Sequence, residues 1–182
     1  MNKIYFFFFI ILLSSCQING SFGGLVSHQK KLEKSNPNML VKSNEDICFQ
    51  SYKPAKVFIV NGKELLSCLS RNEKSLVHIW KPNCSSDLCI PLSNVEAIAD
   101  DINATLYIVA EYYDEAKMKI DYKINNPILG IDCKYYKSSF TKKYLGDFLQ
   151  GLLQKKDVIH YDYYLFEGSQ LKLETNSYQD LQ

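Results

Sequence analysis

KSLVHIWKPNCSSDLCIPLSNVEAIADDINATLYIVAEYY, residues 74–113, is the stretch that decides the fold. Residues 74–80 are nearly all apolar, which is typical of a strand buried on both faces of a sheet. From Leu92 to about Asn103, apolar residues recur every three or four positions and predict an amphipathic helix. Residues 105–113 form a second run of β-branched and aromatic residues. This strand, helix and strand predict a right-handed unit with parallel strands.

The flanking regions complete a mixed α/β pattern. Residues 57–60 predict a strand, followed by an Asn-Gly turn and a short helix up to residue 69. A long helix is expected from a cap at Ser139 to about Lys155, because its apolar residues have near-ideal helical spacing. Residues 158–174 predict a terminal hairpin, whereas 114–138 show at most one short extended piece. Helices on both faces of a small mixed sheet are therefore expected.

The composition suits one globular domain with no bias toward nucleic acid. The chain has 182 residues, 46% of them hydrophobic and 13% aromatic. Lys and Arg number 21 against 20 Asp and Glu, so the formal net charge is only +1. Nucleic-acid binding would require a basic excess for phosphate contacts, and we expect no such partner.

The N-terminus has the pattern of an export signal. Lys3 precedes an apolar run, 4–13, that is too short to span a bilayer. Leu13-Ser14-Ser15-Cys16 resembles the lipobox of bacterial lipoproteins, which implies a signal peptide over 1–15 and an acylated Cys16. The alternative is an ordinary signal peptide that is cleaved off without attachment of a lipid. We expect the acylated N-terminus and a polar tether over 16–54, the folded domain over 55–175 and a fraying tail over 176–182.

Cys84 and Cys89 are the candidate reactive residues. The chain has six cysteines. If Cys16 is acylated, five remain, and this odd number leaves at least one thiol without an intramolecular partner. Cys84 and Cys89 lie between a strand and a helix start, where the helix dipole favours a thiolate. Cys84 is expected to be the more exposed, attacking thiol, and Cys89, at or just inside the helix, the resolving thiol. An inert disulfide that fastens a loop is the alternative, and a Cys48–Cys68 bond is also possible.

These residues carry a resemblance to a known fold. The strand LVHIW, the turn KPN, the cysteine pair, the helix and LYIVAEYYD are similar to the active-site half of thioredoxin-fold proteins, particularly the membrane-tethered redoxin and TlpA-like reductases of bacterial envelopes. YYLFEGSQLKL is similar to their final hairpin, so the resemblance covers about residues 74 to 175. It implies a thioredoxin-like three-layer α/β/α sandwich with a central mixed sheet and a terminal β-hairpin.

The resemblance also implies a function and a set of site residues. It implies thiol-disulfide exchange with envelope proteins that carry thiols or disulfides, by a lipid-anchored, periplasm-facing protein that needs no cofactor. Cys84 and Cys89 match the nucleophilic and resolving cysteines, and Trp80 matches the tryptophan that ends the first core strand. The substrate-binding residues would be Trp80, Pro82, Asn83 and Tyr161.

Two departures from the family pattern keep other functions open. The cysteines are separated by four residues instead of two, and Tyr161 stands where the family has a cis-proline, so we expect a trans peptide bond there. A copper chaperone of the Sco type would use Cys84, Cys89 and His160, because thiolates and an imidazole suit copper. A non-catalytic adaptor is the third possibility. His78, inside an apolar strand, is expected to be a hydrogen-bonded core residue.

Overall fold

The computed structural model describes residues 24–42, 48, 50–84 and 89–181. The predicted signal peptide and Cys16 lie outside these residues. None of the helices in this part of the chain is long and apolar enough to cross a membrane.

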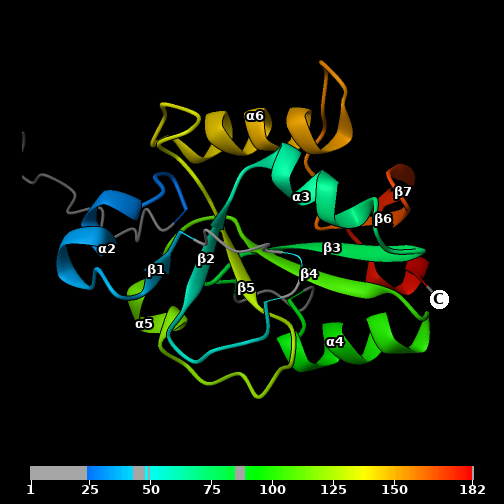
Figure 1. Ribbon diagram of the computed structural model, residues 1–182, viewed down its shortest axis with the longest axis horizontal. Coiled ribbons are helices and arrows are strands. Elements are labelled where there is room, and N and C mark those ends of the chain that lie inside the picture. The colour runs from blue at the N-terminus through cyan, green and yellow to red at the C-terminus, as the bar shows by residue number, and fades with distance from the viewer. Residues whose placement is uncertain (1–23, 43–47, 49, 85–88, 182) are drawn as a thin grey trace, which may run out of the picture.

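In the described part of the chain, seven strands form one mixed sheet in the order β1-β2-β5-β4-β3-β6-β7 (Figure 1). β3 (Lys74–Trp80) pairs in parallel with β4 (Thr105–Ala110) and antiparallel with β6 (Tyr163–Glu167). β6 and β7 (Gln170–Thr175) form the terminal hairpin. The predicted parallel pair and the predicted hairpin are both confirmed.

Helices cover both faces of this sheet. α3 (Gly62–Leu69) and α6 (Thr141–Leu153) pack together on one face, and α4 (Leu92–Asp101) lies against β4 on the other (Figure 1). The apolar side of α6 is buried, as its periodicity predicts, although the helix begins two residues after Ser139 and ends two residues before Lys155. The fold is therefore an α/β sandwich around a mixed sheet.

The region 114–138 contains more structure than its sequence predicts. α5 (Glu115–Met118) and β5 (Ile128–Ile131) lie in it, and β5 inserts between β2 (Val57–Val60) and β4. The strand has only four residues and contains Gly130, so its pattern is weak. The glycine is required there, because a Cβ would lie 2.7 Å from the Tyr113 ring and 2.8 Å from Val57 Cγ1.

Part of the predicted tether belongs to the folded domain, so the boundary at residue 54 is wrong. α2 (Gln29–Ser35) buries Leu32 and Gln29, and β1 (Leu40–Val41) pairs in parallel with β2. Met39 is also buried. The mean polarity of this segment hides two isolated apolar residues, and β2 supplies hydrogen-bonding partners for the two-residue strand β1.

The tail also packs against the domain instead of fraying. Residues Tyr178–Leu181 form a 3₁₀ helix, and Leu181 is buried. The Asn176 side chain accepts a hydrogen bond of 3.0 Å from the Asp162 amide, next to the site considered below. One apolar residue and one turn are sufficient to hold these residues.

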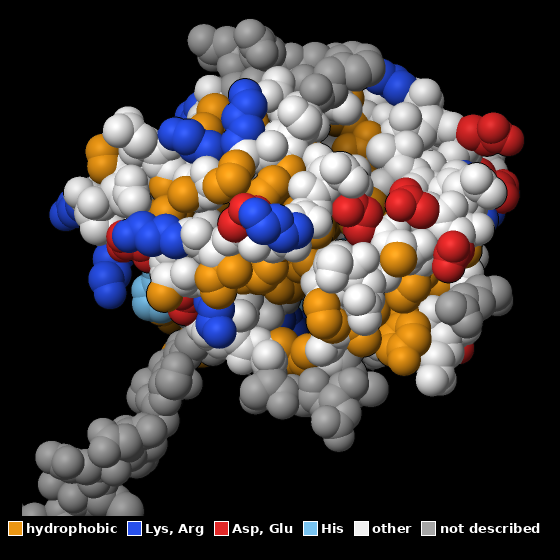
Figure 2. Space-filling view, turned by 90° about the horizontal axis from the view of Figure 1, so that it is seen from below, with side chains coloured by type: hydrophobic (Ala, Val, Ile, Leu, Met, Phe, Trp, Pro, Cys, Tyr) orange, Lys and Arg blue, Asp and Glu red, His pale blue; other side chains and the backbone are white. Residues whose placement is uncertain are grey.

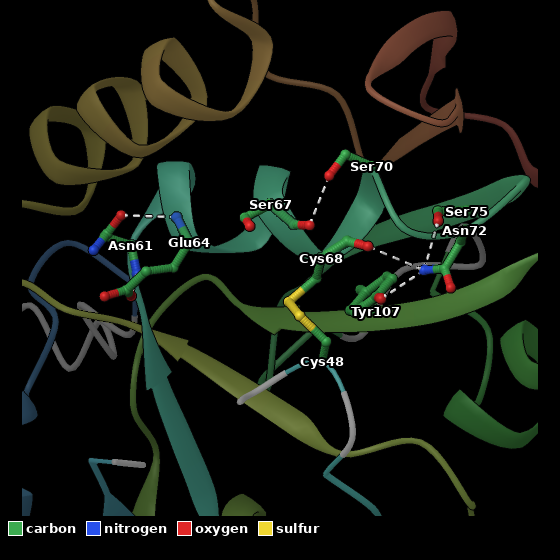
Figure 3. Close-up of a disulfide and its surroundings, with 9 residues drawn as sticks. All are labelled: Cys48, Asn61, Glu64, Ser67, Cys68, Ser70, Asn72, Ser75 and Tyr107. Carbon is green, nitrogen blue, oxygen red and sulfur yellow. Dashed lines mark hydrogen bonds between the residues drawn. A yellow bond between two sulfur atoms is a disulfide. The ribbon is translucent and has the colours of Figure 1, made fainter. Parts of the chain in front are cut away.

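A disulfide between Cys48 and Cys68 fastens the segment before β2 to the end of α3 (Figure 3). The Cα atoms are 5.1 Å apart, within the range of disulfides. Asn61 begins α3 with a capping box: its side chain accepts from the amides of Lys63 and Glu64, and the Glu64 carboxylate accepts from the Asn61 amide. The predicted Asn-Gly turn is thus a helix start.

Gly62 lets α3 approach the backbone of α6, which gives a prediction for stability. A Cβ on Gly62 would overlap the Phe148 carbonyl oxygen and lie 2.8 Å from the Leu152 amide nitrogen. We expect Gly62→Ala to lower the free energy of unfolding by at least about 2 kcal/mol, because backbone must move. Gly146→Ala, whose Cβ would meet only the His160 ring at 3.9 Å, should raise it by about 1 kcal/mol. Urea denaturation of the two variants checks this; equal effects would contradict it.

Candidate functional site

Cys84 and Cys89 lie on either side of a short loop between β3 and α4. Cys84 is exposed and Cys89 is half-buried, as predicted for an attacking and a resolving thiol. The two are joined as a disulfide with Cα atoms 5.9 Å apart. The Cys84 amide donates to the Lys81 carbonyl across a turn at 3.0 Å. Cys89 precedes the helix by three residues, so its predicted place at or inside the helix start is wrong.

Both cysteines line a groove of about 330 Å³ at the C-terminal end of β3. Its walls come from β3 and the turn after it, the start of α4, the region after α5, and the segment before β6. The lining residues are His78, Ile79, Trp80, Lys81, Pro82, Cys84, Cys89, Ile90, Pro91, Leu92, Ser93, Lys117, Ile120, Tyr122, Asp162 and Tyr163. A mostly apolar groove with a few charges beside a disulfide has the composition of a site that accepts another molecule.

The structure brings only some of the predicted substrate-binding residues to this groove. Trp80 and Pro82 line it. Asn83 does not: its amide donates to the Tyr112 hydroxyl at 3.0 Å, and its side chain donates to Asp114 at 2.6 Å. Asn83 therefore ties the turn after β3 to the segment after β4.

Tyr161 also lies outside the groove lining. Its amide donates to the Tyr164 hydroxyl at 2.9 Å, and the two rings meet edge to face. No peptide bond in the described residues is cis, as expected at this position. The next two residues, Asp162 and Tyr163, line the groove in its place.

Asp162 organises the polar end of the groove, a role that sequence reasoning missed. Its carbonyl accepts from the Ile79 amide at 2.9 Å and from His78 Nδ1 at 3.1 Å. Its carboxylate forms an ion pair of 2.6 Å with Lys81. These contacts join the end of β3 to the segment before β6. The one feature of the sequence that points to Asp162 is its place in the loop directly before β6, since functional residues are often found in loops next to strands.

Electrostatics at this end of the sheet depend on burial. Burial raises the pKa of Glu111. The positive charge of Lys81 lowers this pKa in part, and the negative charge of Asp162 raises it further. The Glu111 amide donates to the Trp80 carbonyl, which continues the backbone contact between β3 and β4. Lys81 and Lys117 are the cations that line the groove, and positive charge favours a thiolate at Cys84 or Cys89.

The aromatic wall of the groove depends on residues far from the cysteines in sequence. Tyr122 packs edge to face on Trp80, with ring centroids 5.4 Å apart. Tyr52 holds this region by donating from its hydroxyl to the Ile120 carbonyl and accepting from the Tyr122 amide, each at 3.2 Å. Tyr52 follows Cys48 closely, so the Cys48–Cys68 disulfide supports the wall through it.

Glu96 fixes the other end of the same segment. This α4 carboxylate is 8% exposed and accepts from the backbone amides and side-chain amides of both Asn125 and Asn126, at 2.6 to 3.3 Å. The Asn125 carbonyl in turn accepts from the Tyr52 amide at 2.9 Å. The buried carboxylate is thus fully hydrogen-bonded, and helix α4 and the groove wall form one unit.

The copper set proposed from the sequence is not assembled. His160 is exposed, lies beside Gly146 of α6 and does not line the groove. Among the described residues, no group of three or more His, Cys, Asp or Glu side chains is placed to hold a metal ion.

Cys133 is the free thiol that the odd cysteine count requires within the described chain. It is buried behind β5, and its amide donates to the Gln29 side chain at 2.9 Å. Burial raises its pKa to about 12, so the group is a neutral thiol at pH 7. Cys133 is therefore poorly suited to exchange.

Comparison with known proteins places no relative beside this chain. A scan of protein-family models, a search of curated proteins and a search of solved structures each found no match.

His78 makes the stability of the domain depend on pH. The side chain is 7% exposed and stacks on Tyr163. Burial lowers its pKa to about 4; the carbonyl and the charge of Asp162 oppose this shift, and the charge of Lys81 adds to it. The expected hydrogen-bonded core histidine is thus confirmed. The unfolded chain takes up a proton near pH 6.5 and the folded chain only near pH 4, so stability falls as pH decreases through this interval.

We expect the free energy of unfolding to drop by about 2 kcal/mol between pH 7 and pH 5 through His78 alone. His78→Gln, which keeps a donor for the Asp162 carbonyl, should remove this part of the pH dependence. Urea denaturation of wild type and variant at both pH values measures it. His28→Gln, an exposed histidine, is the matched control, and identical pH slopes for all three proteins would contradict the assignment.

Proposed function

We propose that this protein exchanges thiols and disulfides with other proteins of a bacterial envelope through Cys84 and Cys89, on a thioredoxin-like scaffold. The observation that carries the proposal is an exposed cysteine, disulfide-bonded to a half-buried one, at the mouth of a groove. A structural disulfide needs no adjoining cavity. The Cys48–Cys68 bond differs from the Cys84–Cys89 bond, because its Cys68 side is 1% exposed.

The scaffold supports the proposal in its general arrangement. A parallel strand-helix-strand unit carries the cysteines in the connection before its helix, an antiparallel hairpin lies beside its first strand, and helices cover both faces. These are the features on which the resemblance to thioredoxin-fold proteins rests. Asp162 and Tyr163, at the start of the hairpin, line the same groove as the cysteines.

The proposed reaction needs no cofactor. The Cys84 thiolate attacks one sulfur of a partner disulfide, which forms a mixed disulfide and releases the other partner sulfur as a thiolate that takes a proton from water. The Cys89 thiolate then attacks Cys84, which breaks the mixed disulfide and releases the second partner thiol. The partner gains two electrons, and Cys84–Cys89 becomes the disulfide seen in the structure. The reverse sequence oxidises a partner dithiol.

The exposure difference between the cysteines predicts which variant traps a partner. Cys89→Ser should capture envelope proteins in a mixed disulfide through Cys84, whereas Cys84→Ser should capture far fewer, because the remaining thiol is half-buried. Non-reducing gels and mass spectrometry of the trapped species measure this. Adding Cys133→Ser to the Cys89→Ser protein should leave capture unchanged. A pair that stays oxidised at every accessible potential, with no capture by either variant, sinks the exchange mechanism and leaves an adaptor role.

We propose that Cys16 carries the lipid that holds this domain at the membrane, because it follows Leu13-Ser14-Ser15 at the end of an export signal. Labelling of cells with a palmitate analogue should mark the protein, and Cys16→Ala should abolish the label. A label that survives Cys16→Ala would show that lipid is attached elsewhere. Cys133→Ala, which removes a cysteine that forms no disulfide, is the matched control for the loss of one cysteine.

A further inference from the structure

A second cavity lies away from the cysteine groove, where the chain enters the domain. It has a volume of about 330 Å³ and is lined by two segments, through Ser27, Gln29 and Lys30 of one and Cys133, Lys134, Lys137, Ser138 and Ser139 of the other. The two segments run side by side at the left of Figure 1, where the Ser27 amide donates to the Ser139 carbonyl at 2.8 Å. Two segments that are more than 100 residues apart in sequence therefore form its walls.

Most side chains that line this cavity are cations or carry a hydroxyl group. Lys30, Lys134 and Lys137 line it together with the serines 27, 138 and 139, and no carboxylate is among the lining residues. Lys134 is engaged by Glu33 at 2.7 Å, so two of the three ammonium groups have no ion-pair partner among the described residues. Ammonium and hydroxyl groups are donors that suit the oxygens of a phosphate group.

The walls are held in place before any ligand binds. The Gln29 side chain is 1% exposed; it accepts from the Cys133 amide at 2.9 Å and donates to Glu33 at 3.2 Å. The Ser138 amide donates to the Cys133 carbonyl at 3.2 Å, which closes the loop that carries Lys134 and Lys137. A backbone that is already fixed reduces the entropy lost when a ligand binds.

Charge on this molecule is unevenly distributed despite the net charge of +1. On the face that Figure 2 shows, basic side chains gather in the left half and acidic side chains in the right half. At the cavity itself, Lys30 on α2 lies with Lys134 and Lys137. A local positive field of this kind concentrates anions.

We infer that this cavity binds a phosphate group, either free or in a phospholipid headgroup. The lipid source is geometrically open: Cys16 is eight residues before Gly24, so the described domain begins within about 28 Å of an acylated Cys16. The inference is independent of thiol exchange, since none of the cavity residues lines the cysteine groove.

The test uses the full chain with Cys16→Ser, which removes the acylation site, and inorganic phosphate as the first probe. Isothermal titration should show saturable binding that K30Q/K137Q weakens by about tenfold, the loss expected when hydrogen bonds to a charged group are removed. K63Q/K156Q, which removes the same charge from two exposed lysines elsewhere, should leave affinity within about twofold.

The second probe distinguishes the two phosphate sources. Sedimentation with phosphatidylcholine vesicles, with and without phosphatidylglycerol, is compared for the two double variants; residues 1–15 are common to both. Weaker binding of K30Q/K137Q to the anionic vesicles alone supports a lipid headgroup. Phosphate binding without any difference between vesicles supports a soluble phosphate compound. No saturable phosphate binding, or equal loss in both double variants, overturns the site.

Discussion

The burial of β3 is the constraint on which the rest of this structure depends. Six of its seven residues are buried, and it hydrogen-bonds to β4 on one side and β6 on the other. A strand held from both sides has a fixed end, and the chain that leaves it carries Trp80, Lys81, Pro82 and then Cys84. The position of the exposed cysteine is therefore set by the core, and the groove opens where the ladder stops.

The rest of the groove is built by side chains that fix loops to this core. Glu96 holds the Asn125 region from α4, Tyr52 holds the Ile120 region, and the carbonyl of Asp162 joins the segment before β6 to β3. Each contact satisfies a backbone group that a loop would otherwise leave open to water. Both disulfides fit this arrangement with different roles: Cys48–Cys68 restrains a supporting segment, while Cys84–Cys89 is at the surface.

The sequence predicts those parts of the fold whose burial is continuous. β2 and β3 have the predicted bounds, because runs of apolar residues mark strands covered on both faces, and α6 agrees to within two residues at each end because one face is wholly apolar. The site residues that the sequence predicts correctly lie in one short stretch: Trp80, Pro82, Cys84 and Cys89. Tyr122 and Asp162 could not be found, because long-range packing alone brings them to the groove. Tyr161, chosen by register with a hairpin, turned its amide and ring toward Tyr164 instead.

The largest difference between sequence and structure also changes how the domain relates to its N-terminus. Polar composition predicts a tether up to residue 54, yet Leu32 and Met39 are sufficient to bring 24–42 into the fold, since β1 completes its hydrogen bonds on the edge of β2. The part of the chain left to connect Cys16 with the domain is then seven residues, 17–23. With the lipid that we propose at Cys16, a connection this short would keep the start of the domain near the membrane. Ser27 and Lys30, which the fold recovers from the predicted tether, line the basic cavity.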